Sequence, residues 1–129
     1  MKFGFTALAL LVGSLSVASL PVNAETTLND GVYSKEQAAR GKESFEANCK
    51  ACHLPEFYKD KLASWDQAPL VDFYDLVAST MPQSAPGSLT DEQYADALAY
   101  IFSFLGYPDG DKELSYTDGS MDDILIVTK

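Results

Sequence analysis

The chain has 129 residues, with 9 Lys and Arg against 19 Asp and Glu, and a formal net charge of −10 at pH 7. This length favours one domain, and the acidic balance argues against binding to nucleic acid or to anionic membrane surfaces. The acidity fits a protein steered to partners that present a basic patch, although it can also serve solubility alone.

Residues 1–24 have the pattern of a secretory signal peptide. Lys2 supplies a positive start, an apolar run follows over residues 5–20, and the sequence Pro-Val-Asn-Ala at residues 21–24 combines a helix breaker with small residues before a cleavage point. The apolar run is shorter than the roughly 20 residues of a membrane span. We therefore favour cleavage before Glu25 over an uncleaved membrane anchor. Export predicts a periplasmic protein without stable membrane insertion. Cleavage would also remove Lys2, which changes the formal net charge to −11, with 8 Lys and Arg against 19 Asp and Glu.

Residues 25–33 are polar, contain a turn sequence, and predict an N-terminal extension. A helix is predicted from Ser34 to about Asn48. Ser34 and Gln37 have the spacing of a capping box, in which the serine hydroxyl and the glutamine amide each satisfy a free backbone N–H. Gly41 in mid-helix costs about 1 kcal/mol relative to alanine, which indicates that another helix approaches closely there.

Both cysteines and the only histidine of the chain lie in the stretch Cys49-Lys50-Ala51-Cys52-His53. The pattern C-x-x-C-H is typical of covalent haem c attachment, in which two thiols bond to the porphyrin and the imidazole takes one axial position of the iron. A redox-active dithiol would need a βαβ context that the sequence does not suggest. A plain disulfide remains an alternative. A zinc site would need further cysteine or histidine ligands, which the chain lacks.

Residues 54–65 show no clear period and predict a loop that can include a short helical turn. A helix is expected next, with Pro69 in its first turn and an end near Thr80, because Met81 precedes Pro82 and is therefore restricted to extended conformations. The apolar face of this helix consists of Leu70, Phe73, Tyr74 and Val77.

The last helix is predicted to begin at Thr90, which forms a capping box with Gln93, and to end before Gly106. Apolar side chains cover most of its circumference: Tyr94, Leu98, Tyr100, Ile101, Phe104 and Leu105. Residues 107–129 form an acidic C-terminal tail. The apolar run at residues 124–127 suggests a docked strand or an extended segment.

The second axial ligand of a haem iron must come from a residue other than histidine. Beyond residue 24 the only methionines are Met81 and Met121. Met81 is the stronger candidate, because it lies between two helices and Pro82 restricts the backbone beside it. Ligation by His53 and Met81 would raise the reduction potential and leave no open position, as a one-electron carrier requires. The alternatives are a core methionine at this position and a haem module for ligand binding or sensing with an open sixth site.

In the order of these features, the chain resembles a class I cytochrome c over roughly residues 31–115. The resemblance implies an all-α fold with three to four helices around one covalently bound haem, a cytochrome domain at residues 34–106, and electron transfer in place of enzymatic activity. It also implies that Trp65 bonds a haem propionate, although a core aromatic is equally open. The crossing of the first and last helices is expected to bring together Gly41, Phe45, Tyr100, Ile101 and Phe104.

Several flanking segments are similar to the haem domains that serve pyrroloquinoline quinone dehydrogenases. The segments are Gly31-Val32-Tyr33-Ser34, Gln37-Ala38-Ala39-Arg40-Gly41, Met81-Pro82, Ala85-Pro86-Gly87-Ser88-Leu89, Gly106-Tyr107-Pro108 and Glu113-Leu114. This likeness implies a quinoprotein dehydrogenase of alcohols or sugars as electron donor, and the respiratory chain, through a terminal oxidase or another cytochrome, as acceptor. Two features depart from the cytochrome family: Leu54 follows His53 where glycine is usual, and the next loop is short. Pro55 is therefore only a candidate for orienting His53.

Overall fold

Four α-helices dominate the part of the chain that the computed structural model describes, Met1 and residues 24–129. The helices are α1 (Lys35–Asn48), α2 (Phe57–Ala63), α3 (Leu70–Thr80) and α4 (Asp91–Phe104). They are flanked by the short strands β1 (Thr26–Thr27) and β2 (Ile124–Leu125) and by the 3-10 turns η1 (Leu28–Asp30) and η2 (Ser120–Asp123). The predicted all-α fold is confirmed. The signal peptide expected over residues 1–24 lies outside the described residues, except for its first and last.

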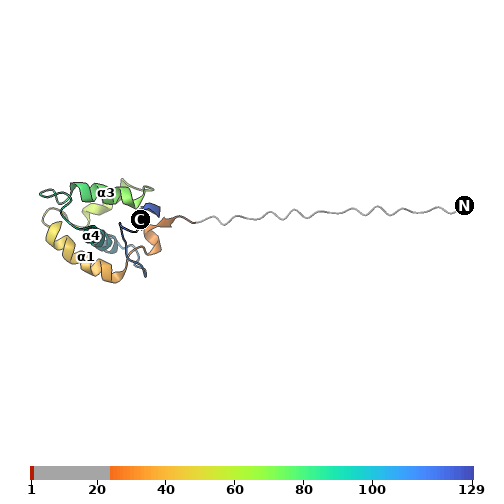
Figure 1. Cartoon of the computed structure of the whole chain (residues 1–129), viewed down its shortest axis with the longest axis horizontal. Helices are drawn as coiled ribbons and strands as arrows, with labels where there is room; N and C mark the ends of the chain where they lie inside the picture. The colour runs from red at the N-terminus through yellow and green to blue at the C-terminus, as the bar shows by residue number, and fades with distance from the viewer. Residues whose placement is uncertain (2–23) are drawn as a thin grey trace.

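The helix α4 lies between α1 and α3 (Figure 1), and its main partner is α1. At Gly41 the two helices approach so closely that an added Cβ atom would lie 1.7 Å from the carbonyl oxygen of Asp96. One turn further along α1, the Phe45 and Tyr100 rings are 5.4 Å apart between centroids. The expected crossing therefore exists: Gly41 lies against both Asp96 and Tyr100, and Phe45 packs on Tyr100. Among residues 24–129, no helix is long and apolar enough to cross a membrane.

The capping box predicted at the start of α1 is only half right. The Ser34 hydroxyl accepts the Gln37 backbone N–H at 3.0 Å, as expected. The Gln37 amide, however, donates to the Leu114 carbonyl at 2.8 Å and accepts the Leu114 N–H at 2.7 Å. Gln37 is buried, so its amide needs hydrogen-bond partners inside the protein. The backbone of Leu114 supplies them, and the predicted bond from the Gln37 amide back to Ser34 does not form. At α4, by contrast, Thr90 and Gln93 form both bonds of the predicted box.

Replacing Gln37 by alanine is expected to destabilise the protein by about 2–3 kcal/mol. The change leaves both backbone groups of Leu114 without a partner in a buried position, and each unsatisfied group costs about 1–3 kcal/mol. Urea unfolding would measure the loss. Gln93→Ala is the control, since it removes a glutamine whose bond to the Thr90 N–H is exposed, and it should cost less than 1 kcal/mol. Equal losses in the two variants would contradict this role of Gln37.

Residues 57–63 correct the loop that was expected between His53 and Trp65. They form the two-turn helix α2. Its Tyr58 and Leu62 are spaced four residues apart, lie on one face, and are 6 % and 1 % exposed. Such a short helix has too few turns to show a period in the sequence, and its stability comes from this burial.

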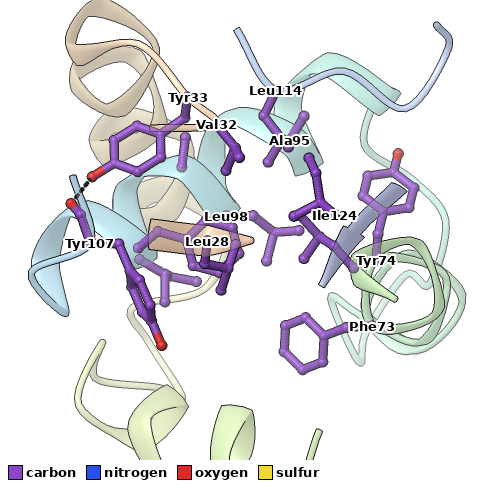
Figure 2. Close-up of a cluster of buried hydrophobic side chains, with 14 of the residues drawn as sticks. Leu28, Val32, Tyr33, Phe73, Tyr74, Ala95, Leu98, Tyr107, Leu114 and Ile124 are labelled. Atoms are coloured by element: carbon purple, nitrogen blue, oxygen red, sulfur yellow. Dashed lines mark hydrogen bonds between the residues drawn. The ribbon is translucent and has the colours of Figure 1, made fainter. Parts of the chain in front are cut away.

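Both ends of the described chain belong to the core of the same domain. The strands β1 and β2 pair in parallel, with Thr26 opposite Ile124 and Thr27 opposite Leu125. The two terminal segments contribute eight of the buried apolar side chains: Leu28, Val32, Tyr33, Tyr107, Leu114, Met121, Ile124 and Ile126. Figure 2 shows several of them around Leu98 of α4, together with the Tyr33 hydroxyl that donates to the Tyr107 carbonyl. The segment after residue 106 is therefore folded onto the helices.

Arg40 on α1 joins two acidic side chains. It bonds the nearly buried Asp96 on α4 at 3.1 and 3.3 Å, and the half-exposed Glu113 at 2.8 and 3.0 Å. The hydrogen bonds from Arg40 hold the pKa of Glu113 below its usual range. The ion pair therefore ties the C-terminal segment to the crossing of α1 and α4.

Stability is expected to fall with acid in part through Glu113. Because its folded-state pKa is depressed, the ion pair stabilises the protein above the unfolded value of about 4.3, and this contribution disappears as the pH falls through the folded-state pKa. Glu113→Gln should therefore cost up to about 1 kcal/mol at pH 7, since solvent screens the pair, and less at pH 3. Urea unfolding at both pH values tests this, with Glu92→Gln as an exposed control. If the loss of unfolding free energy in Glu113→Gln were larger at pH 3 than at pH 7, the predicted direction of the pH dependence would be wrong.

Candidate functional site

A cavity of about 590 Å³ opens between the end of α1, the end of α3 and the inner face of α4. Four of the predicted site residues line it: Cys49, Cys52, His53 and Met81. Further lining comes from apolar side chains, among them Tyr58, Val77, Leu89, Tyr94, Ala97, Leu98 and Ile101. The thiols, the imidazole and the thioether, which are spread over 33 positions of sequence, thus border one mostly apolar space.

The two cysteines lie in a tight turn directly after α1. Cys49 caps the helix, and its carbonyl oxygen accepts the backbone N–H groups of Cys52 at 3.1 Å and His53 at 3.0 Å. No disulfide joins the two cysteines, of which Cys49 is half-buried and Cys52 is exposed. This turn holds both sulfur-bearing residues and the histidine at the cavity.

Burial raises the pKa of the Cys49 thiol. Redox-active C-x-x-C pairs depend on a lowered thiol pKa, because the thiolate is the attacking species. The described residues also contain no βαβ unit, since their only two strands are two-residue segments at the ends of the domain. These observations argue against the redox-dithiol alternative.

His53 is held by aromatic rings from α2. Its ring stacks on Phe57 with centroids 4.9 Å apart, and the edge contact with Tyr58 spans 6.0 Å. Burial, with a further contribution from Cys49, raises the pKa of Tyr58 to about 12, so this wall of the cavity stays uncharged. The Pro55 carbonyl accepts the Tyr58 backbone N–H at 3.0 Å. No hydrogen bond from another described residue reaches the His53 ring, so Phe57 and Tyr58 are the side chains that the structure places against it.

Met81 directly follows α3. Its backbone N–H donates to Val77 at 2.9 Å, and its carbonyl accepts the Tyr94 hydroxyl at 2.6 Å. Together with His53, it lines both the large cavity and an adjoining one of about 140 Å³. The other methionine that the sequence left open, Met121, is fully buried in the core and lines neither cavity.

Trp65 does not join the other predicted site residues. Its ring packs edge-on against Phe73 at 5.6 Å, and it lines neither cavity, which favours the core aromatic that was open for it. Of the two lysines on α2, Lys61 lines the smaller cavity and Lys59 does not. Phe57, Tyr58 and Tyr94 are site residues that the sequence did not suggest. Phe57 and Tyr58 contact His53 from four and five residues further along the chain, and Tyr94 bonds Met81 from α4. The only sequence signal of all three was an apolar character that a core position also has.

The donor set fits a haem c. Two thiols suit covalent attachment to the porphyrin, while an imidazole nitrogen and a thioether sulfur suit the two axial positions of iron. The surrounding apolar side chains exclude water, and no buried polar side chain in the described residues lacks a hydrogen-bond partner. Such a site on four helices with crossing first and last members defines a small c-type cytochrome.

A family model described as cytochrome c oxidase, cbb3-type, subunit III matches residues 36–101, which are 66 of the 129 residues. The chain therefore belongs to this family of c-type cytochromes and is an electron-transfer protein with covalently bound haem c, not an enzyme. No curated protein and no solved structure matches the chain.

Proposed function

We propose that this protein is an exported carrier of single electrons, with one haem attached at Cys49 and Cys52 and its iron ligated by His53 and Met81. The observation that carries the proposal is that these four residues line one cavity. Haem supplies the ferric–ferrous couple. The chain contributes the attachment points, the axial donors and an apolar enclosure.

The second axial donor separates electron transfer from ligand sensing. A thioether favours ferrous iron and raises the reduction potential, and an apolar lining disfavours the extra charge of ferric iron. Val77, Leu98 and Ile101 supply such a lining beside Met81. With both axial positions filled, small molecules such as carbon monoxide have no open site. Electrons then enter and leave without bond making or breaking.

We further propose a periplasmic location, with a quinoprotein dehydrogenase as donor and a terminal oxidase or another cytochrome of the respiratory chain as acceptor. The sequence likeness of several segments to quinoprotein-associated haem domains supports this donor. Three of these segments, together with the neighbouring Gly110, pack on one another in this fold. The Gly110 N–H donates to the Tyr33 carbonyl at 2.7 Å, and Gln37 pairs with Leu114. A side chain at Gly110 would collide with the Gly31 backbone. The net negative charge would favour partners with a basic docking patch.

Purified protein tests the proposal directly. Mass spectrometry should show a protein lacking residues 1–24 with the mass of one haem added, and neither cysteine should react with an alkylating reagent. The ferrous protein should show a low-spin haem c spectrum and bind carbon monoxide slowly or not at all. Rapid carbon monoxide binding would instead establish a sensing module. Alkylation of both cysteines would establish a free dithiol.

The donor is tested by mixing the ferric protein with a quinoprotein dehydrogenase and its alcohol or sugar substrate. Reduction of the haem that requires both enzyme and substrate is expected. A rate that falls with added salt would support electrostatic docking, because salt screens charges separated by more than about 8–10 Å. A haem that stays oxidised with dehydrogenases of both substrate classes would contradict the partnership while leaving the electron-carrier function intact.

A further inference from the structure

We infer that Tyr94 is the positioning residue of this site, because its hydroxyl holds the backbone of Met81 so that the thioether stays directed at the iron. The inference rests on the proposed ligation by Met81 and deepens it by naming what keeps that ligand in place.

The backbone of Met81 is held from both sides. Its N–H donates to the Val77 carbonyl at 2.9 Å, which ties it to the last turn of α3. Its carbonyl accepts the Tyr94 hydroxyl at 2.6 Å, which ties it to α4. Within the described chain, no second hydrogen bond reaches that carbonyl. Tyr94 therefore links the residue that follows α3 to α4 at the cavity.

The Tyr94 hydroxyl is itself fixed in place by packing. Tyr94 is 4 % exposed, and its ring meets the Tyr74 ring edge-on at 6.1 Å. Tyr74 is fully buried, donates its hydroxyl to Asp91 at 2.9 Å, and stacks on Tyr116 at 4.4 Å. The C-terminal segment thereby contributes, through Tyr116 and Tyr74, to the placement of Tyr94.

A methionine ligand depends on such restraint more than a histidine does. The methionine side chain has three rotatable bonds and adapts to its surroundings, so its sulfur is located only as well as the backbone that bears it. Met81 is followed by a loop at residues 82–89 before α4 begins. Without the Tyr94 bond, the Met81 carbonyl can move with this loop, and the fraction of molecules with sulfur off the iron increases. An added ligand then competes more effectively, because its apparent affinity scales with that fraction.

Two matched variants of the full holoprotein test this role. Tyr94→Phe removes one hydroxyl that donates to the Met81 carbonyl, and Tyr107→Phe removes one that donates to the Val127 carbonyl at 2.8 Å, outside the cavity lining. In the ferric protein, Tyr94→Phe should bind imidazole about fivefold more tightly, the factor expected for one net hydrogen bond, and should weaken the sulfur-to-iron absorption band. Tyr107→Phe should keep the wild-type affinity and band, even if both variants lose similar stability.

The outcomes separate this inference from the proposed ligation. A wild-type band together with unchanged imidazole affinity in Tyr94→Phe would overturn the inference alone. A wild-type protein without the band would overturn ligation by Met81 and the inference with it. Should Tyr94→Phe fail to fold with haem, 3-fluorotyrosine at residue 94 keeps the ring and makes the hydroxyl a stronger donor. Imidazole binding should then weaken, and an unchanged affinity would equally overturn the inference.

Discussion

Replacing Met81 by leucine is expected to abolish the sulfur-to-iron band and to lower the reduction potential of the haem. Leucine conserves the volume of methionine, so the cavity wall is retained while the thioether is lost. Because a thioether ligand favours ferrous iron, the potential should fall by a sizeable part of the roughly 0.8 V over which axial ligands set haem potentials. The open position should also admit carbon monoxide rapidly in the ferrous state. Visible spectroscopy and redox titration measure all three changes.

The other methionine beyond residue 24, Met121, provides the control for this experiment. Met121 is fully buried but lines neither cavity, so Met121→Leu should leave the band and the potential at wild-type values and cost less than about 1.5 kcal/mol of stability. A band that survives in Met81→Leu and disappears in Met121→Leu would transfer the ligand role to the C-terminal segment.

Gly41→Ala is expected to destabilise the protein by about 3 kcal/mol or more. Its Cβ atom would lie 1.7 Å from the Asp96 carbonyl oxygen and 2.5 Å from the carbonyl carbon, so α1 and α4 would have to separate. The free-energy cost of overpacking the crossing exceeds the gain of about 1 kcal/mol that alanine brings to a helix interior relative to glycine. Because these helices also border the haem cavity, the yield of holoprotein should fall. Urea unfolding of the purified holoprotein gives the magnitude.

Gly106→Ala is the comparison for Gly41→Ala, because Gly106 has room for a Cβ atom and requires glycine only for its backbone conformation. No atom lies within 4 Å of a Cβ built at Gly106, but its φ of +83° is a conformation that other residues adopt at a cost of about 1–2 kcal/mol. Its expected loss is therefore smaller than that of Gly41→Ala. Equal losses would indicate that the crossing relaxes to accept a methyl group and that glycine is not required there.

Predictions based on local rules agree with the structure where the partners lie within one or two turns. The Thr90 box with Gln93, the end of α3 before Met81, and the turn at Gly106 all depend on interactions over a few residues. The same rule was wrong in part at Gln37, because the position is buried and its amide pairs with a backbone 77 residues away. Local spacing predicted that the Gln37 amide forms a hydrogen bond to a backbone group, but not that this group belongs to Leu114.

The short elements were the hardest to predict from sequence. The helix α2 has seven residues and the strands have two each, so none of them is long enough to show a sustained hydrophobic pattern. Their stability comes from contacts with distant segments, as at Leu62 and at Ile124 opposite Thr26. A sequence window cannot contain both sides of such a contact.

The identities of the candidate donor atoms follow from the amino-acid sequence alone. Two cysteines separated by two residues, a histidine directly after them and a methionine before proline do not depend on folding, and they already predicted haem c and candidate axial donors. How these candidate donors are held depends on the folded chain. Phe57 stacks on His53 from four residues further along, once α2 has formed, and Tyr94 bonds Met81 from a separate helix. The identity of a ligand depends on the atoms of one residue, whereas its position depends on the side chains that the fold packs around it.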